Sequence, residues 1–148
     1  MKTKHNHQLR FTSLAFCVLT TLFIIGCKKN NDKTGAELNT ATLIGSSSWK
    51  ISSVMVDNVD KTTMYTGMTL TFATDSYTTS NGKVVWPASG KWSFETSEGK
   101  VIRRDDGLEI TVSSIASDKL TLELDWASTT YGGRLSAMQG HHVFKFTR

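Results

Sequence analysis

Apolar residues recur at every second position along most of the chain from Leu43 onward. Residues 91–95, Lys-Trp-Ser-Phe-Glu, show this spacing clearly, as do residues 120–126, Leu-Thr-Leu-Glu-Leu-Asp-Trp. A period of two is typical of a β-strand with one buried and one solvated face, whereas an amphipathic helix repeats every 3.6 residues. The pattern predicts about eight short strands, at residues 49–51, 68–72, 77–80, 91–95, 100–104, 108–113, 120–126 and 142–147.

Turn-forming residues separate these strands. Asn81-Gly82 and Asp106-Gly107 are typical of two-residue hairpins, in which both central residues adopt positive φ. Residues 97–99 and 116–118 are further turn candidates, and Pro87 lies in a loop-like stretch. Connections this short make sequential strands antiparallel neighbours.

The fold class follows from the strands and their connections. No long amphipathic helix is predicted between strands, which excludes parallel βαβ units. We therefore predict an all-β protein, an antiparallel up-and-down barrel of about eight short strands, with a two-sheet β-sandwich as the alternative. The barrel is favoured because closing the sheet removes the exposed edges, which few prolines here would protect.

The first 26 residues have a different character. Residues 1–10 contain Lys2, Lys4 and Arg10 but no acid, and residues 11–26 contain no charge. As a helix the apolar run would span about 24 Å, which is less than the ~30 Å hydrocarbon layer of a bilayer. This pattern predicts a signal peptide over residues 1–26.

The leader ends in Ile24-Ile25-Gly26-Cys27, which resembles a bacterial lipobox. The resemblance implies that Cys27 is lipidated and becomes the first residue of the mature protein, with three acyl chains that anchor it stably. The alternative is an uncleaved anchor with an incidental cysteine. Both interpretations attach the domain to a membrane.

A polar segment follows Cys27. Residues 28–40 contain one leucine among Lys, Asn, Asp, Thr and Gly, which predicts a flexible linker. We therefore assign the lipidated cysteine and its tether to residues 27–42 and the folded domain to residues 43–148.

The formal charge of +4 comes mostly from the leader. The leader holds three of the 17 basic residues, which leaves 14 basic residues against 13 acids in the rest of the chain. The remainder is close to neutral and has no basic stripe, so a nucleic-acid partner is not expected.

Several motifs together resemble the small lipocalin-like lipoproteins of Gram-negative envelopes. They are the lipobox, the tether, Gly45 with Trp49-Lys50, the segment 89–94 and the closing segment 140–146. The resemblance covers residues 43–148 and implies an eight-stranded barrel that binds a small apolar ligand.

The match to lipocalins departs from their pattern at one motif. In lipocalins a Gly-x-Trp motif opens the first strand, whereas three serines separate Gly45 from Trp49 here. Lipocalins also place an arginine of the last strand across that tryptophan, and the candidates for this role are Arg148 and Arg134.

The inward face of the predicted strands is rich in large apolar residues, including Ile51, Leu108, Ile110, Val112 and Leu120. An eight-stranded barrel is just wide enough to be filled by side chains or to hold one small ligand, so this face forms either a plain core or a ligand wall. The candidate ligand-binding residues are Trp49, Leu70, Phe72, Trp92, Phe94, Leu122, Leu124, Phe144 and Phe146.

Two adjacent arginines, Arg103 and Arg104, lie at the end of one predicted strand. Strand alternation directs them to opposite faces, so one shares the inner face. An inward arginine is a candidate clamp for the carboxylate of a fatty-acid-like ligand. The alternative is that both pair with the Asp105-Asp106 turn in solvent, where such pairs contribute little.

Catalytic and metal-binding patterns are not recognisable. His141 and His142 are adjacent on an extended segment, so their side chains diverge, and no cysteine lies near them in sequence. No EF-hand loop follows Asp105, and no Gly-x-Ser-x-Gly motif occurs. We expect no enzymatic activity, no cofactor and no metal. The long connection 127–140 is interpreted as a contact surface, a lid or a cover for one barrel end.

Two functions remain open. The first is a non-enzymatic, lipid-anchored protein of the cell envelope, with the outer membrane favoured, that binds a small hydrophobic molecule. The second is a filled β-domain that docks to an envelope protein through its rim loops. A connected apolar cavity of about 300 Å³ or more inside the sheet favours the first. A filled interior with an exposed apolar patch at the rim favours the second.

The lipobox generates a direct prediction. Cys27→Ser removes the sulfur that carries the diacylglyceryl group, so the chain no longer incorporates labelled palmitate and no longer fractionates with membranes once its leader is removed. Radiolabelling and membrane fractionation in a Gram-negative host measure both effects. Normal leader processing with continued membrane binding would show that the lipobox assignment is wrong.

Overall fold

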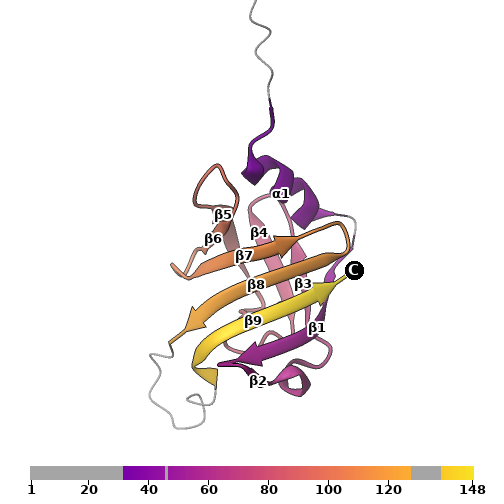
Figure 1. Cartoon of the computed structure of the whole chain (residues 1–148), viewed down its shortest axis with the longest axis vertical. Helices are drawn as coiled ribbons and strands as arrows, with labels where there is room; N and C mark the ends of the chain where they lie inside the picture. The colour runs from indigo at the N-terminus through magenta and orange to yellow at the C-terminus, as the bar shows by residue number, and fades with distance from the viewer. Residues whose placement is uncertain (1–31, 46, 128–137) are drawn as a thin grey trace, which may run out of the picture. The chain divides into compact units, whose positions relative to one another are not determined.

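The alternating segments form antiparallel strands of one sheet that closes on itself (Figure 1). The structure is a computed structural model, and it describes residues 32–45, 47–127 and 138–148. Within these residues the elements are α1 (Gly35–Ile44), β1 (Trp49–Val56), β2 (Val59–Asp60), the 3₁₀ helix η1 (Thr62–Tyr65), β3 (Thr69–Phe72), β4 (Ser76–Ser80), β5 (Ser89–Phe94), β6 (Val101–Arg104), β7 (Glu109–Ile115), β8 (Lys119–Trp126) and β9 (Gly140–Thr147).

Pairing between the first and last long strands closes the barrel. Sequential strands from β3 to β9 are neighbours, β1 pairs with β3, and β1 also pairs with β9 through Ile51↔Phe146 and Val54↔Phe144. The result is an eight-stranded antiparallel barrel, with β2 as one additional strand at the edge of β1. The predicted barrel and all eight predicted strands are confirmed, and the sandwich alternative is wrong.

Two β-bulges, one in β1 and one between Val112 and Ser114 of β7, change which residues face inward. The register of β1 against β9 shifts between Ile51 and Ser53, and beyond the shift Val54 and Val56 are buried. A bulge adds one residue to one strand and so reverses the alternation from that point. Ile51 precedes the shift and pairs with the buried Phe146; it is partly buried and packs against the core.

Two turn predictions are wrong in detail. The Asp106-Gly107 hairpin has a four-residue connection, 105–108, in which Gly107 has φ 84° and its N–H donates to the Arg104 carbonyl at 3.0 Å. This is a type I turn followed by a left-handed glycine. Asn81-Gly82 begins an eight-residue connection, 81–88, between β4 and β5. The two-residue type I′ geometry occurs instead at Asp57-Asn58, where φ is 48° and 66°.

A helix occupies part of the predicted tether. Residues 35–44 form α1, although the sequence predicted a flexible tether as far as residue 42. A capping box starts it, because Thr34 Oγ1 accepts from the Glu37 N–H at 3.2 Å and the Glu37 carboxylate accepts from the Thr34 N–H at 2.8 Å. Residues 32–148 form one compact unit, so the folded domain begins before residue 43.

The N-terminal half of α1 is fixed to the turn between β5 and β6. The Ala36 N–H donates to the Ser97 carbonyl at 2.9 Å, and Asn39 Nδ2 donates to the Gly99 carbonyl at 2.9 Å. The helix lies at the end of the barrel away from β2 (Figure 1). We call this the helix end, and we call the end formed by the connections 57–68, 81–88 and 105–108 the far end.

One carbonyl at the C-terminus of α1 accepts hydrogen bonds from residues at the start of the first strand and just after the last strand. The Leu43 carbonyl accepts from Trp49 Nε1 at 3.1 Å and from Arg148 Nη2 at 2.6 Å. The Arg148 guanidinium lies 3.8 Å from the centre of the Trp49 ring. The predicted arginine across the first-strand tryptophan is thus confirmed for Arg148, while Arg134 lies outside the described residues. A Cβ at Gly45 would collide with the guanidinium, which explains the glycine.

The core fills the barrel along its length. Its buried members are Leu43, Trp49, Val54, Val56, Tyr65, Met68, Leu70, Phe72, Tyr77, Val85, Trp86, Trp92, Ile102, Ile110, Val112, Leu120, Leu122, Leu124, Met138, Phe144 and Phe146.

Some sequence predictions fall outside the described residues. These are the signal peptide, Cys27 and most of the connection 127–140. Among the helices that the structure does describe, none has the length and apolar character needed to cross a membrane.

The contact of Gly45, Trp49 and Arg148 generates a stability prediction. Arg148→Ala removes a cation–π contact and a charged hydrogen bond, so the free energy of unfolding falls by about 2 kcal/mol. Gly45→Ala causes a similar loss because the methyl group displaces the guanidinium. Urea denaturation measures both losses. In the Arg148→Ala background Gly45→Ala has little effect, and a full additional loss there would contradict this account.

Candidate functional site

The predicted ligand-binding residues all lie on the inner face of the barrel. Trp49, Leu70, Phe72, Trp92, Leu122, Leu124, Phe144 and Phe146 are buried, and Phe94 is partly buried against them. They therefore serve as core, and their inward placement is as the alternation predicts. Their role in binding a ligand stays a prediction for all of them.

Trp92 and Phe94 differ from the others because they reach the helix end. Their rings are in edge contact at 5.3 Å, and Phe72 makes a similar contact with Trp92 at 5.1 Å. Trp92 Nε1 donates to the carbonyls of Ala73 and Ser76, both at 3.0 Å, which fixes the ring below the β3–β4 turn. The indole is thus held in one orientation with its polar atom satisfied.

A groove of about 500 Å³ lies between this aromatic pair and α1. Helix α1 supplies one wall, the β3–β4 turn supplies its edge, and β5 supplies the floor. The lining residues are Ala36, Glu37, Thr40, Ala41, Thr74, Asp75, Trp92, Ser93 and Phe94. Methyl groups and aromatic rings dominate the floor and wall, and the two carboxylates belong to exposed residues.

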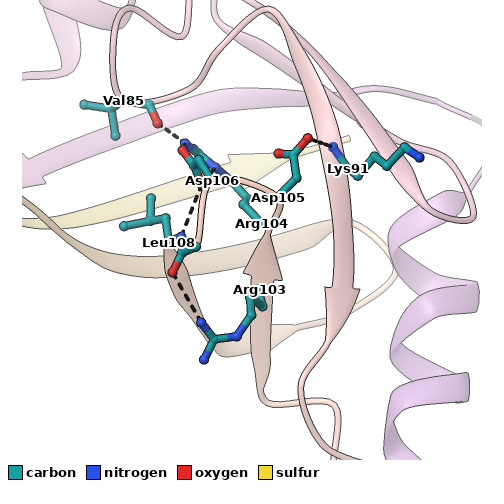
Figure 2. Close-up of polar contacts among 8 residues, drawn as sticks. Val85, Lys91, Arg103, Arg104, Asp105, Asp106 and Leu108 are labelled. Atoms are coloured by element: carbon teal, nitrogen blue, oxygen red, sulfur yellow. Dashed lines mark hydrogen bonds and ion pairs between the residues drawn. The ribbon is translucent and has the colours of Figure 1, made fainter.

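The two predicted clamp residues lie on opposite faces of β6, as the alternation requires (Figure 2). Arg103 is on the outer face, where its Nη2 lies 2.5 Å from carboxylate oxygens of both Glu95 and Glu109. Hydrogen bonding to Glu95 raises the pKa of Arg103 above its ordinary value. Arg103 therefore belongs to an exposed ion-pair group on the outside of the barrel.

Arg104 points inward and is 2% exposed. Its guanidinium donates to the Val85 carbonyl at 2.6 Å and pairs with both carboxylate oxygens of Asp106, with Nε 3.1 Å from Oδ1 (Figure 2). Partial burial raises the pKa of Asp106, but the bonds from Arg104 and Leu108 outweigh this and the pKa is lowered. The carboxylate on the inward arginine thus comes from the chain itself, and a role with a ligand carboxylate stays a prediction.

The far end contains a second aromatic group that the sequence did not indicate. Trp86 from the 81–88 connection, Tyr65 from η1 and His142 from β9 all pack on Phe144, with ring centres 6.1, 5.2 and 5.6 Å away. Trp86 and Tyr65 escaped prediction because they lie on connections rather than on alternating strands. The apolar run Val84-Val85-Trp86 within a connection is the one signal that could have revealed the first of them.

The adjacent histidines diverge, as predicted, but only one lies on the rim. His141 is half-exposed, with Nδ1 2.9 Å from Asp125 and Nε2 3.5 Å from Glu123. His142 is fully buried and its Nδ1 lies 3.0 Å from the Gly140 carbonyl. His142 therefore belongs to the barrel interior. Within the described ranges no three His, Cys, Asp or Glu side chains are arranged to hold a metal ion.

The two histidine environments shift their pKa values in opposite directions. Burial lowers the pKa of His142 from its ordinary value of 6.5. The hydrogen bond to Asp125 raises the pKa of His141, and Glu123 adds to the effect. At neutral pH His142 is thus uncharged, with a proton on Nδ1 for the Gly140 carbonyl.

No known protein-family model matches this sequence, and no curated protein matches it. The eight-stranded antiparallel barrel is consistent with the lipocalin-like fold that the motifs imply.

The buried histidine generates a pH prediction. Below about pH 6.5 His142 takes up a proton in the unfolded chain but stays neutral in the folded chain, because its folded pKa is lowered. Each further fall in pH therefore favours the unfolded chain and reduces the free energy of unfolding, until the pH reaches the folded pKa. His142→Gln should therefore reduce the loss of stability between about pH 7 and pH 5, as measured by urea denaturation.

His141→Gln is the matched control. The raised pKa of His141 stabilises the folded state below about pH 6.5, and this contribution is lost as the pH rises through the folded value. The His141 variant should therefore lose more stability on acidification than the wild type. Identical pH profiles for the wild type and the His142 variant would contradict the neutral, buried state of His142.

Proposed function

We propose that this protein is a non-enzymatic, lipid-anchored carrier of the bacterial cell envelope that binds a small apolar molecule at the helix end of its barrel. The groove between α1 and β5 is the observation that carries the proposal. Its volume of about 500 Å³ lies in the range of small-molecule sites, which are typically 300–1,000 Å³ and mostly apolar.

The groove suits an apolar guest because its floor is aromatic and its wall consists of small residues. Trp92 and Phe94 offer ring surface, and Ala36 and Ala41 leave space that larger side chains would fill. The Trp92 N–H is already bonded to the chain, so the ring presents apolar surface to the groove. Burial of a guest against it is favourable by about 25 cal/mol per Å² of apolar surface.

The deep interior is a weaker candidate than the groove for this apolar guest. Trp49, Leu70, Leu122 and Phe144 have an exposure of 0% each, and they pack against side chains from the opposite wall. An eight-stranded barrel has little interior volume beyond its own side chains. The binding surface is therefore placed at the barrel mouth.

The position of the groove fits a membrane anchor. Thr34, the residue that caps α1, follows Cys27 by seven positions in the sequence. A chain of that length reaches about 25 Å at most. If Cys27 carries lipid, the groove beside α1 is held close to the bilayer, from which apolar molecules partition.

A second candidate function is docking to an envelope protein through the far end. Three apolar side chains are exposed on connections or short elements there, namely Val59 at 54%, Met64 at 38% and Val84 at 41%. Exposed apolar residues at one end of a domain favour a protein contact. The filled interior and this exposed patch are what docking requires. We still prefer the carrier function because the open groove beside α1 offers a mostly apolar space of about 500 Å³.

The groove generates a binding prediction with the neutral probe N-phenyl-1-naphthylamine. The probe should bind the mature chain, residues 27–148 with Cys27→Ser to exclude lipid, with a saturable rise in fluorescence at one site per chain. Ala41→Phe fills the groove and should weaken binding by about tenfold or more, because the inserted ring occupies space that the probe needs.

Leu38→Phe is the matched control for the groove variant. Leu38 lies on the same helix, is 53% exposed and does not line the groove, so the added ring should leave affinity unchanged. Equal effects of the two variants, or no saturable binding to the parent chain, would contradict the proposed site.

A further inference from the structure

The Trp86 indole occupies the barrel interior although it belongs to a connection. It is 1% exposed, and it makes edge contacts with the rings of Tyr77 at 5.6 Å and Phe144 at 6.1 Å. The Arg104 guanidinium lies 5.4 Å from its ring centre and 5.8 Å from that of Tyr77. The interior therefore surrounds the indole with two aromatic edges and a cation, which is a favourable environment for any planar aromatic ring.

Several buried polar atoms in the region of the Trp86 ring lack a hydrogen-bond partner, although the ring itself is closely packed. Six buried side-chain atoms have no hydrogen-bond partner in the part of the chain that the structure describes. Two are Trp126 Nε1 and Arg148 Nε, and the four in this region are Trp86 Nε1, Tyr65 Oη, His142 Nε2 and Thr79 Oγ1. Buried polar groups in folded proteins are nearly always paired, so four in one region require an explanation. The indole fills the space well by shape but leaves this hydrogen-bonding capacity unused.

The chemistry of these atoms indicates what they would bind. Because His142 Nδ1 donates to the Gly140 carbonyl, Nε2 of the neutral ring is an acceptor. Tyr65 keeps its proton, since burial raises its pKa to about 12, and its hydroxyl both donates and accepts. A hydroxyl is the smallest ligand group that can both donate to a histidine nitrogen and accept from a phenol, whereas a carboxylate cannot donate and an ammonium cannot accept.

The connection that carries Trp86 is attached at its two ends and by few polar contacts between them. At the ends, Asn81 Nδ2 donates to the Thr66 and Gly67 carbonyls at 3.4 Å, and the Ala88 carbonyl accepts from the Thr79 N–H at 2.8 Å. Arg104 Nη1 binds the Val85 carbonyl at 2.6 Å, and the Trp86 N–H binds the Gly82 carbonyl at 3.0 Å within the connection itself. Lys83 adopts φ 58°, a left-handed conformation that is unfavourable for a residue with a side chain. Release of this connection would relieve that conformation and vacate the space of the indole.

We propose that the space filled by the Trp86 indole is a second binding site, which admits a hydroxylated planar aromatic molecule when the 81–88 connection withdraws. The ligand ring takes the place of the indole between Tyr77, Phe144 and Arg104. Its hydroxyl group engages Tyr65 and His142. This site is at the far end and is independent of the groove beside α1.

The experiment uses 2-naphthol as the probe and naphthalene as the matched compound without a hydroxyl. The mature chain with Cys27→Ser is labelled with 5-fluorotryptophan, and its four tryptophans give ¹⁹F resonances that single Trp→Phe variants assign. Saturating 2-naphthol should move the Trp86 resonance toward the shift of solvent-exposed tryptophan. Naphthalene should bind about fivefold more weakly, which corresponds to one hydrogen bond.

Two variants test the mechanism separately. Trp86→Ala removes the competing indole and should tighten 2-naphthol binding by roughly tenfold, because the free protein no longer fills its own site. Tyr65→Phe should remove most of the preference for 2-naphthol over naphthalene. If Trp86→Ala fails to fold, the shift of the Trp86 resonance in the wild type and the comparison with Tyr65→Phe still test the second site.

The outcomes separate this site from the groove. A shift of the Trp92 resonance alone means that the probe enters only the groove, and it overturns the second site while supporting the first. An unmoved Trp86 resonance at millimolar 2-naphthol also overturns it, as does an unchanged preference in Tyr65→Phe. A Trp86 shift without any Trp92 shift supports the second site and leaves the groove to be judged by its own probe.

Discussion

The pairing of β1 with β9 is the constraint on which the rest of the structure depends. It turns a meander of short strands into a closed wall, which gives the alternating side chains an inside and an outside. The seam is reinforced at the helix end by the Leu43 carbonyl, which receives hydrogen bonds from Trp49 at the start of β1 and Arg148 after β9. One backbone oxygen therefore joins the helix, the first strand and the chain end.

Closure also limits where a ligand can bind. An eight-stranded wall leaves room for little more than its own side chains, and here Trp49, Tyr65, Trp86 and Phe144 take that room. Space remains where α1 crosses the barrel mouth, since alanines face Trp92 and Phe94 there. The far end differs because the ring that fills it, that of Trp86, comes from a connection and not from a strand. Several buried polar atoms in the region of that ring have no hydrogen-bond partner within the described residues.

The period of two was sufficient to predict the strands and the face of most of their residues, because each strand buries one side of an antiparallel sheet. It predicted that one of two adjacent arginines points inward, but the identity of its partner, Asp106, depends on a turn whose geometry differs from the expected one. The bulge in β1 could not be foreseen, since Ser52 and Ser53 carry no signal for the extra residue. Helix α1 was missed because only Leu43 of its residues is buried, although Thr34 and Glu37 form a readable capping box. Trp86 was missed because burial of a loop side chain is decided by tertiary packing.

We propose above all that a closed and largely filled barrel binds an apolar molecule in the groove beside α1. A crystal structure of the protein purified from the envelope of its host, without added ligands, tests this most directly. The account predicts continuous electron density for a small apolar molecule against Trp92, Phe94 and Ala41, with β1 paired to β9. An open sheet at that seam, or a molecule buried between Trp49 and Leu122 with the groove empty, would contradict it.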